Sequence, residues 1–162
     1  MRAADGIPTE KWAEKANAEE WSAAEIAAHL IMVERAIISA ADHIVQKSPR
    51  AFPIWKRVHL PIWLAEARLI RLKSPIALDT ALVGEKEDML RELRFTRERA
   101  LAFLAETEKR DLSAYRWRHV FLGRLNVYEW FEMIAAHQLR HTKQLNELSK
   151  RLPKVVESSQ IQ

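Results

Sequence analysis

Apolar residues recur every three or four positions over most of the chain, which is the spacing of one face of an α-helix. Three stretches show this period most clearly: residues 22–46, 85–106 and 126–151. Their stripes are, in turn, Ile26, Leu30, Val33, Ile37, Ala41 and Ile44; Met89, Leu93, Thr96 or Arg97, Ala100 and Leu104; and Val127, Trp130, Ile134, His137, His141, Leu145 and Leu148. The pattern predicts three long amphipathic helices.

Local start signals support the first and the last of these helices. Each begins with a capping box, in which the first and fourth residues satisfy each other's backbone N–H groups, flanked by a hydrophobic staple. The boxes are Ser22 with Glu25 and Asn126 with Glu129, and the staple pairs are Trp21 with Ile26 and Leu125 with Trp130. Pro49 and Pro153 follow the two helices and end them.

The segments between these helices carry weaker signals. We expect another helix over residues 58–73, with Pro61 tolerated in its first turn. Residues 76–84 read as an irregular connection with a turn of helix near Asp79, and residues 111–125 as a long loop. No strand is predicted. The sequence therefore predicts an all-α fold, a four-helix bundle over residues 21–152, with a lead-in (1–20) and a tail (153–162). Within the lead-in, Pro8 could start a short helix that carries Trp12.

Composition agrees with a helical globular domain. Of 162 residues, 48% are hydrophobic and 30% charged, with only three glycines and six prolines. The absence of cysteine excludes disulfides and thiolate metal sites and fits a reducing cytoplasm. We see no signal peptide and no run as long as the roughly 18–20 apolar residues of a membrane span, so we expect no membrane association.

The net charge of +4 does not mark a nucleic-acid surface. Basic residues are interleaved with acids, as in residues 91–99, which read RELRFTRER. That pattern is typical of a solvated helix face with i,i+4 ion pairs. A phosphate-binding stripe would lack the acids. We therefore expect no nucleic-acid partner.

Two histidines occupy positions of the last stripe where aliphatic residues are expected. His137 and His141 are one turn apart, so their Cβ atoms lie about 5–6 Å apart and two imidazoles can share one ion. His29 lies on the flank of the first stripe and reaches the same level, within about 6 Å, if the two helices run parallel. Three neutral imidazoles with one open position are the usual layout of a catalytic divalent metal site. Structural packing of the pair remains the alternative.

Other polar residues and the tryptophans leave more open. The residue after His137 is Gln138, so the general-base glutamate of the H-E-x-x-H motif is absent and a metalloprotease is not expected. We interpret His43 and His59 as surface or helix-end residues, and His119 as one that could border the site. Arg97 either snorkels or faces an anionic substrate. Most of the six tryptophans are interpreted as core and staple residues, with one or two lining a pocket at the bundle end.

Three segments resemble the DinB-like superfamily of damage-inducible metalloenzymes. They are residues 21–30 (WSAAEIAAHL), residues 118–129 (RHVFLGRLNVYE), and His137 to His141 followed by Gln144. The resemblance covers residues 21–148 in the right order and spacing. Two positions depart from the family pattern. Val120 stands where a proline often follows the loop histidine, and Gln138 stands where an aspartate often follows the first histidine of the pair.

This resemblance implies an up-down-down-up bundle in which the first and last helices run parallel. It also implies that His29, His137 and His141 bind a divalent metal, commonly zinc or nickel, and that the chain can form a homodimer, since dimers are frequent in the family. Some relatives transfer low-molecular-weight thiols, so a thiol S-transferase or a hydrolase acting on a small molecule is the expected function. The sequence offers no clear general base. A non-catalytic bundle that serves as an interaction or stress-response module is the second hypothesis.

Overall fold

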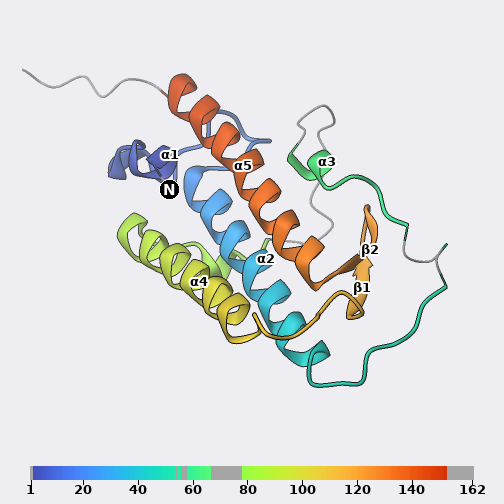
Figure 1. The fold of residues 1–162 in the computed structure, drawn as a ribbon. Helices are drawn as coiled ribbons and strands as arrows, with labels where there is room; N and C mark the ends of the chain where they lie inside the picture. The colour runs from blue at the N-terminus through green and yellow to red at the C-terminus, as the bar shows by residue number, and fades with distance from the viewer. Residues whose placement is uncertain (1, 54, 56–57, 67–77, 153–162) are drawn as a thin grey trace, which may run out of the picture.

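The computed structural model describes residues 2–53, 55, 58–66 and 78–152. Three long helices dominate it: α2 (Ala23–Ile44), α4 (Lys86–Glu106) and α5 (Val127–Arg151) (Figure 1). Two further helices, α1 (Arg2–Asp5) and α3 (Trp63–Glu66), are short, as are the single turns of 3-10 helix η1 (Thr9–Lys11) and η3 (Thr80–Leu82). The predicted all-α fold is confirmed, with one small hairpin added, β1 (Arg116–His119) and β2 (Gly123–Asn126).

Both predicted capping boxes are present. The Ser22 Oγ accepts from the Glu25 N–H at 3.2 Å, and the Glu25 carboxylate accepts from the Ser22 N–H at 2.8 Å. The second box, between Asn126 and Glu129, has the corresponding distances of 2.9 and 2.6 Å. These bonds satisfy backbone donors that have no partner inside the helix, so α2 and α5 begin where the sequence predicts. The turn near Asp79 is also confirmed, as η3.

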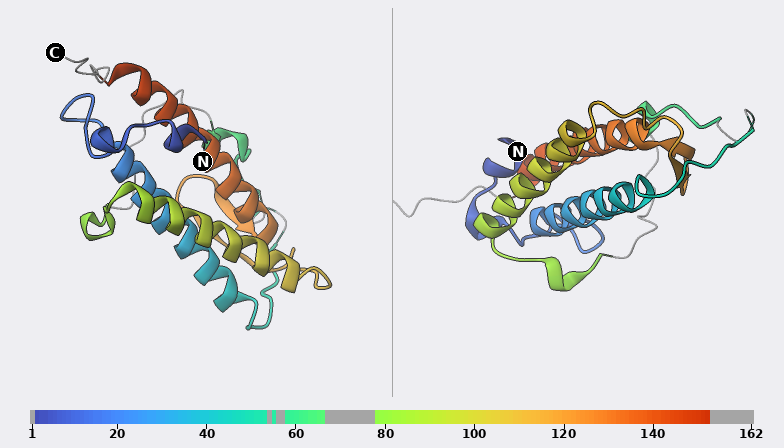
Figure 2. Two further views of the ribbon diagram at one scale, coloured as in Figure 1. Left: turned by 90° about the vertical axis from the view of Figure 1, so that its left-hand side faces the viewer. Right: turned by 60° about the horizontal axis from the view of Figure 1, so that its bottom comes forward.

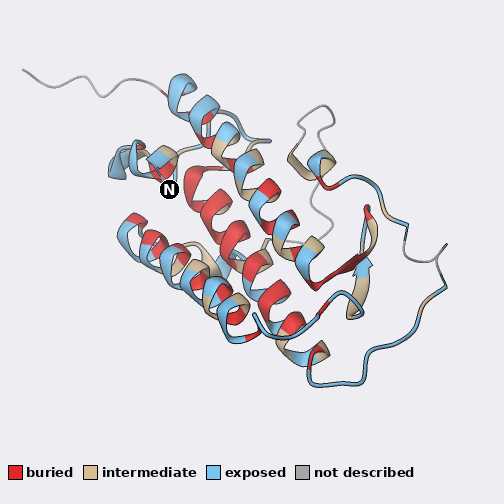
Figure 3. Ribbon diagram, viewed as in Figure 1, coloured by how far each residue is buried: buried red, intermediate tan, exposed pale blue. Residues whose placement is uncertain are grey.

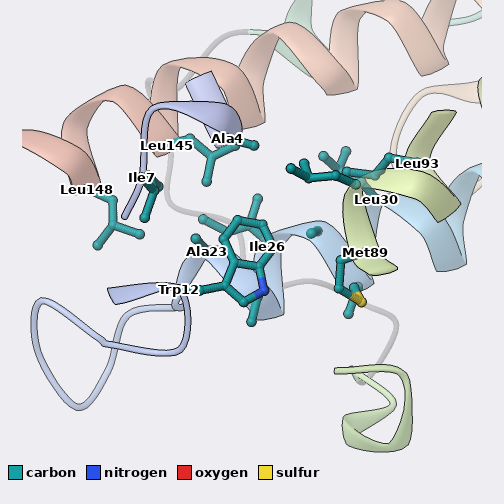
Figure 4. Close-up of a cluster of buried hydrophobic side chains, with 14 of the residues drawn as sticks. Ala4, Ile7, Trp12, Ala23, Ile26, Leu30, Met89, Leu93, Leu145 and Leu148 are labelled. Atoms are coloured by element: carbon teal, nitrogen blue, oxygen red, sulfur yellow. The ribbon is translucent and has the colours of Figure 1, made fainter. Parts of the chain in front are cut away.

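Helix α2 is the centre of the fold and buries a broad face against α4 and α5 (Figure 3). Five buried alanines bring its backbone close to its neighbours: Ala23, Ala24, Ala27, Ala28 and Ala41. At its N-terminal end a hydrophobic cluster joins the start of the chain to all three long helices (Figure 4). Ala4, Ile7 and Trp12 are buried there, and the Trp12 Nε1–H donates to the Gly84 carbonyl at 3.1 Å. Residues 4–12 of the predicted lead-in therefore supply part of the core.

The predicted direction of the last helix is wrong. The first turns of α2 share a cluster with Leu145 and Leu148 near the end of α5, whereas Ala41 at the end of α2 packs with Val127, the first residue of α5. Helix α5 is thus antiparallel to α2, and α4 is parallel to α2 (Figures 1 and 2). An up-down-down-up bundle requires the first and last helices to be parallel, so that order is not adopted.

The connection between α4 and α5 explains this direction. Residues 111–125, predicted as a loop, fold back as a hairpin in which Arg116 pairs with Asn126 and His119 with Gly123. The chain therefore returns to the end of α4 before α5 begins. Two hydrogen bonds stabilise the place where the ends of α2 and α4 meet the start of α5. The Arg110 guanidinium donates to the Val45 carbonyl at 2.8 Å, and the Tyr128 hydroxyl donates to the Arg110 carbonyl at 3.0 Å.

The second predicted helix also starts later than expected. Val58 is not helical, His59 forms an isolated bridge with Gly123, and the Leu60 N–H donates to the Leu122 carbonyl at 2.8 Å. Helix α3 begins only at Trp63. The remainder of the predicted helix, residues 67–73, lies outside the described residues. No helix in the described part of the chain combines the length and apolar character needed to cross a membrane.

Candidate metal centre

The three predicted histidines converge between α2 and α5. The Nε2 of His137 lies 3.2 Å from that of His29 and 3.1 Å from that of His141. One ligand atom from each ring falls within 4.8 Å of the others. The rings meet at steep angles of 64–85°, so their nitrogens point toward a shared centre and the rings do not stack. The structure therefore places one residue of α2 and two of α5 at a single point.

The spacing of these nitrogens matches that around a tetrahedral ion. With metal–nitrogen bonds of about 2.0–2.1 Å, two ligands of a tetrahedral site lie about 3.3–3.4 Å apart. The alternative, hydrogen bonding between neutral rings, accounts for the cluster less well. The His137 Nε2 is within bonding distance of two other nitrogens. A neutral ring nitrogen has either one proton to donate or one lone pair to accept with. The residues present therefore fit a divalent ion.

Burial keeps the rings of His29 and His137 uncharged. His29 and His141 are each 5% exposed. Burial lowers the pKa of His29 to about 4. It lowers the pKa of His137 to about 2, assisted by the charges of His141, His29, Arg140 and His119. Neutral imidazole is the form that binds a metal, so the lone pairs stay available well below neutral pH.

Residues around the cluster hold two of the rings. The Gln144 side-chain oxygen lies 2.9 Å from the His141 Nδ1 and can accept a hydrogen bond from its N–H. The Nε2 lone pair of His141 is then free to point toward the centre of the cluster. The Trp21 ring packs 4.9 Å from the His29 ring and 6.4 Å from the His141 ring, between centroids. Trp21 is half-buried and was predicted only as a staple residue. It also packs over the histidine cluster.

An acidic residue that the sequence analysis missed lies beside His137. Glu34 of α2 is 2% exposed, and it lines a narrow recess together with His137 and Gln138. The Gln138 amide donates to one carboxylate oxygen of Glu34 at 2.9 Å, and Arg97 of α4 lies 3.5 Å from the other. Burial raises the pKa of Glu34, while Arg97 and Gln138 oppose that rise. The only sequence signal was a glutamate inside an otherwise apolar face of α2.

The structure also resolves what the sequence left open about Arg97 and the other histidines. Arg97 pairs with Glu34 and so faces an internal acid. His43 is exposed, as predicted. His59 is half-buried at the surface and pairs with Glu129 at 3.2 Å. His119, at the end of β1, packs 5.1 Å from the Trp130 ring, and its Nδ1 accepts from the Phe121 and Leu122 N–H groups, both at 3.1 Å. His119 therefore lies near the centre but is not one of the three converging rings.

Apart from Trp21, the tryptophans divide into two groups. Trp12 and Trp130 are buried, and Trp117 stacks on Trp130 at 4.8 Å between ring centroids. These three confirm the predicted core packing. Trp55 and Trp63 are 75% and 61% exposed, so they do not belong to the core.

Comparison with known proteins places the chain in a family. A protein of Bacillus subtilis (strain 168), described as uncharacterized protein YuaE, is 29% identical over 150 residues, which cover 91% of this chain and 88% of the relative. No solved structure matches this chain. The family model of the DinB superfamily matches residues 1–145, which include His29, His137 and His141. The chain belongs to the DinB superfamily.

Proposed function

We propose that the protein binds one divalent metal ion, zinc or nickel, through the Nε2 atoms of His29, His137 and His141, and that it is a metalloenzyme of the thiol S-transferase or hydrolase type. The observation that carries the proposal is the convergence of three imidazoles, those of His29 and His141 buried and that of His137 half-buried, with Nε2 separations of 3.2 and 3.1 Å that suit a tetrahedral ion. A divalent ion held this way supplies Lewis acidity, which makes a nucleophile of water or a thiol near neutral pH.

The chain's own residues suit such a site. The low pKa values of His29 and His137 keep both rings neutral. The Gln144 side chain orients His141. The Glu34 carboxyl lies in the recess beside His137, and it is the group that we assign as proton acceptor. An acid in that position favours an enzyme over a purely structural metal site.

A non-catalytic metal-stabilised bundle is the second candidate, and one observation favours it. The recess beside His137 is too tight to admit a water molecule in this conformation, and Trp21 packs over two of the three rings. A site closed in this way binds an ion for stability and leaves no room for a substrate.

The metal is tested by elemental analysis of untagged protein beside three histidine variants. We expect about one equivalent of zinc or nickel in the parent and little in His29→Ala or His141→Ala. His43→Ala removes an exposed histidine from the same helix as His29 and should keep the full amount. A parent that purifies without metal and takes up none on addition of zinc would refute the site.

Catalysis is tested separately on metal-loaded protein. A low-molecular-weight thiol with an electrophilic acceptor, and a set of small esters, are the substrates to screen. We expect turnover that Glu34→Gln abolishes while its metal content stays at the parent level. Full metal content with no turnover on either class would instead support the non-catalytic module.

A further inference from the structure

Two arginines face each other on the outer side of the hairpin, away from the histidines. Arg118 of β1 and Arg124 of β2 are directly opposite residues in the antiparallel register. Alternation along β1 turns Trp117 and His119 inward, where both pack on Trp130, and turns Arg118 outward. Like charges directly opposite each other destabilise a strand pair. This arrangement therefore opposes hairpin formation unless an anion offsets it.

No acid offsets these charges in the described part of the chain. Arg116, the preceding outward residue of β1, pairs with Glu129 at 3.4 Å. Neither Arg118 nor Arg124 has such an ion pair with a described residue. Arg124 is held instead by an aromatic ring, because its guanidinium carbon lies 4.5 Å from the centre of the Phe52 ring. Its position is thus fixed while its charge remains available.

An open hollow in the surface is lined by both arginines. It has a volume of about 310 Å³ and is lined by Val58, Arg118, Gly123 and Arg124. That volume is at the lower end of the range for small-molecule sites, roughly 300–1,000 Å³. Two guanidinium groups and a valine side chain offer charge at one part of the wall and apolar surface at another. We call this cavity the arginine pocket.

We propose that the arginine pocket binds the phosphate group of a small molecule. A guanidinium presents its N–H donors in a planar fork that matches phosphate oxygens, and two guanidinium groups together favour a dianion over a carboxylate. The bound phosphate offsets the repulsion between the strands, so binding and hairpin stability are coupled. The site is separate from the metal centre and does not depend on it.

The coupling predicts two separate effects for each arginine variant. One is on the melting temperature without ligand, and the other is on the affinity for phosphate. In phosphate-free buffer of low ionic strength, Arg118→Gln should unfold at a higher temperature than the parent, because a like-charge pair is removed. Arg124→Gln removes the same pair but also loses the contact with the Phe52 ring, so its melting temperature should rise less. Both should lose at least tenfold in affinity for phosphate, measured by calorimetry and as the rise of melting temperature with ligand. A residue with a merely structural role would lower the melting temperature when replaced.

The experiment uses the full chain with three ligands: inorganic phosphate, phenyl phosphate and a short DNA duplex. The matched control is Arg94→Gln, which removes an exposed arginine of α4 and should bind phosphate within twofold of the parent. Saturable binding of phenyl phosphate supports a phosphorylated small molecule as the ligand, and binding of inorganic phosphate alone limits the ligand to the free ion.

Three outcomes would overturn the proposal. The first is no saturable binding of either phosphate at millimolar concentration. The second is an Arg94→Gln variant that weakens binding as much as the pocket variants do, since that marks a non-specific charge effect. The third is a DNA duplex that binds at least tenfold more tightly than both small ligands.

Discussion

The buried ion pair between Glu34 and Arg97 allows a quantitative test of the core beside the three histidines. Glu34 is 2% exposed and Arg97 is 33% exposed, with 3.5 Å between their charged atoms. Removing one partner of a buried pair costs about 3–5 kcal/mol, because the other charge stays buried without compensation. Since solvent reaches a third of Arg97, we expect Arg97→Gln to cost about 2–3 kcal/mol. For a chain of this length that lowers the melting temperature by about 4–12 °C.

The loss of unfolding free energy in Arg97→Gln, relative to the parent, should depend on pH. Burial already raises the pKa of Glu34 above its ordinary value of 4.5, and removing the Arg97 charge raises it further. A raised folded-state pKa contributes stability that is present below the unfolded pKa and lost as pH rises through the folded pKa. The deficit of Arg97→Gln is therefore smallest in acid and grows once the pH exceeds the folded-state pKa of Glu34 in the parent, which lies above 4.5. Urea unfolding followed by circular dichroism at pH 5 and pH 8 measures it.

Two further variants make this test specific. Arg35→Gln breaks an ion pair with Glu92 that joins the same two helices but is exposed, with side chains 46% and 40% accessible, so it should cost less than about 1 kcal/mol. Glu34→Gln in the Arg97→Gln background removes the uncompensated charge and should restore part of the stability. The reasoning is refuted if Arg97→Gln costs no more than Arg35→Gln, or if its deficit is the same at both pH values.

Three other predictions concern single residues. In metal-free protein, the His29 pKa of about 4, against 6.5 unfolded, makes the folded state bind fewer protons, so stability should fall by about 3 kcal/mol between pH 6.5 and 4. Urea titrations should show a flatter profile for His29→Gln, and identical profiles would contradict this. Asn126→Ala, which removes the cap of α5, should cost about 1 kcal/mol in the same assay, and a cost near zero would contradict the cap's role. Gly123→Ala should cost roughly 1–3 kcal/mol, because its φ is +101° and a Cβ would lie 3.3 Å from the Val58 carbonyl, whereas Gly84→Ala meets only Met89 at 3.6 Å and should cost less.

The features that sequence reasoning predicted well depend on neighbouring residues. A capping box needs two residues three positions apart, so Ser22 with Glu25 and Asn126 with Glu129 are visible without any knowledge of the fold. The apolar stripes are local as well, and the histidines were noticed because they interrupt one. Local signals therefore located the long helices and the residues that converge between α2 and α5.

The features that were missed depend on distant residues. The strands of the hairpin are four residues long, and β2 is stabilised from outside by the Leu60 and His59 backbone, more than 60 positions earlier in the chain. Glu34 is visible in the sequence only as an acid on an apolar face, and its partners Arg97 and Gln138 come from α4 and α5. Neither feature has a complete sequence pattern of its own, because each is created by contacts between segments that are far apart in the chain.

The reversed direction of α5 did not disturb the predicted histidine cluster, and helix geometry explains why. With a rise of about 1.5 Å per residue, His29 lies about 9 Å from the start of α2, and His141 lies about 15 Å from the end of α5. The same difference of about 6 Å results when a parallel arrangement is assumed and His137 is measured from the start of α5. Residues near the middle of a helix keep nearly the same height when the helix is turned over. The level of the histidines could therefore support their convergence but not the direction of α5, which is set by the hairpin and by the bonds of Arg110 and Tyr128 at the corner it forms.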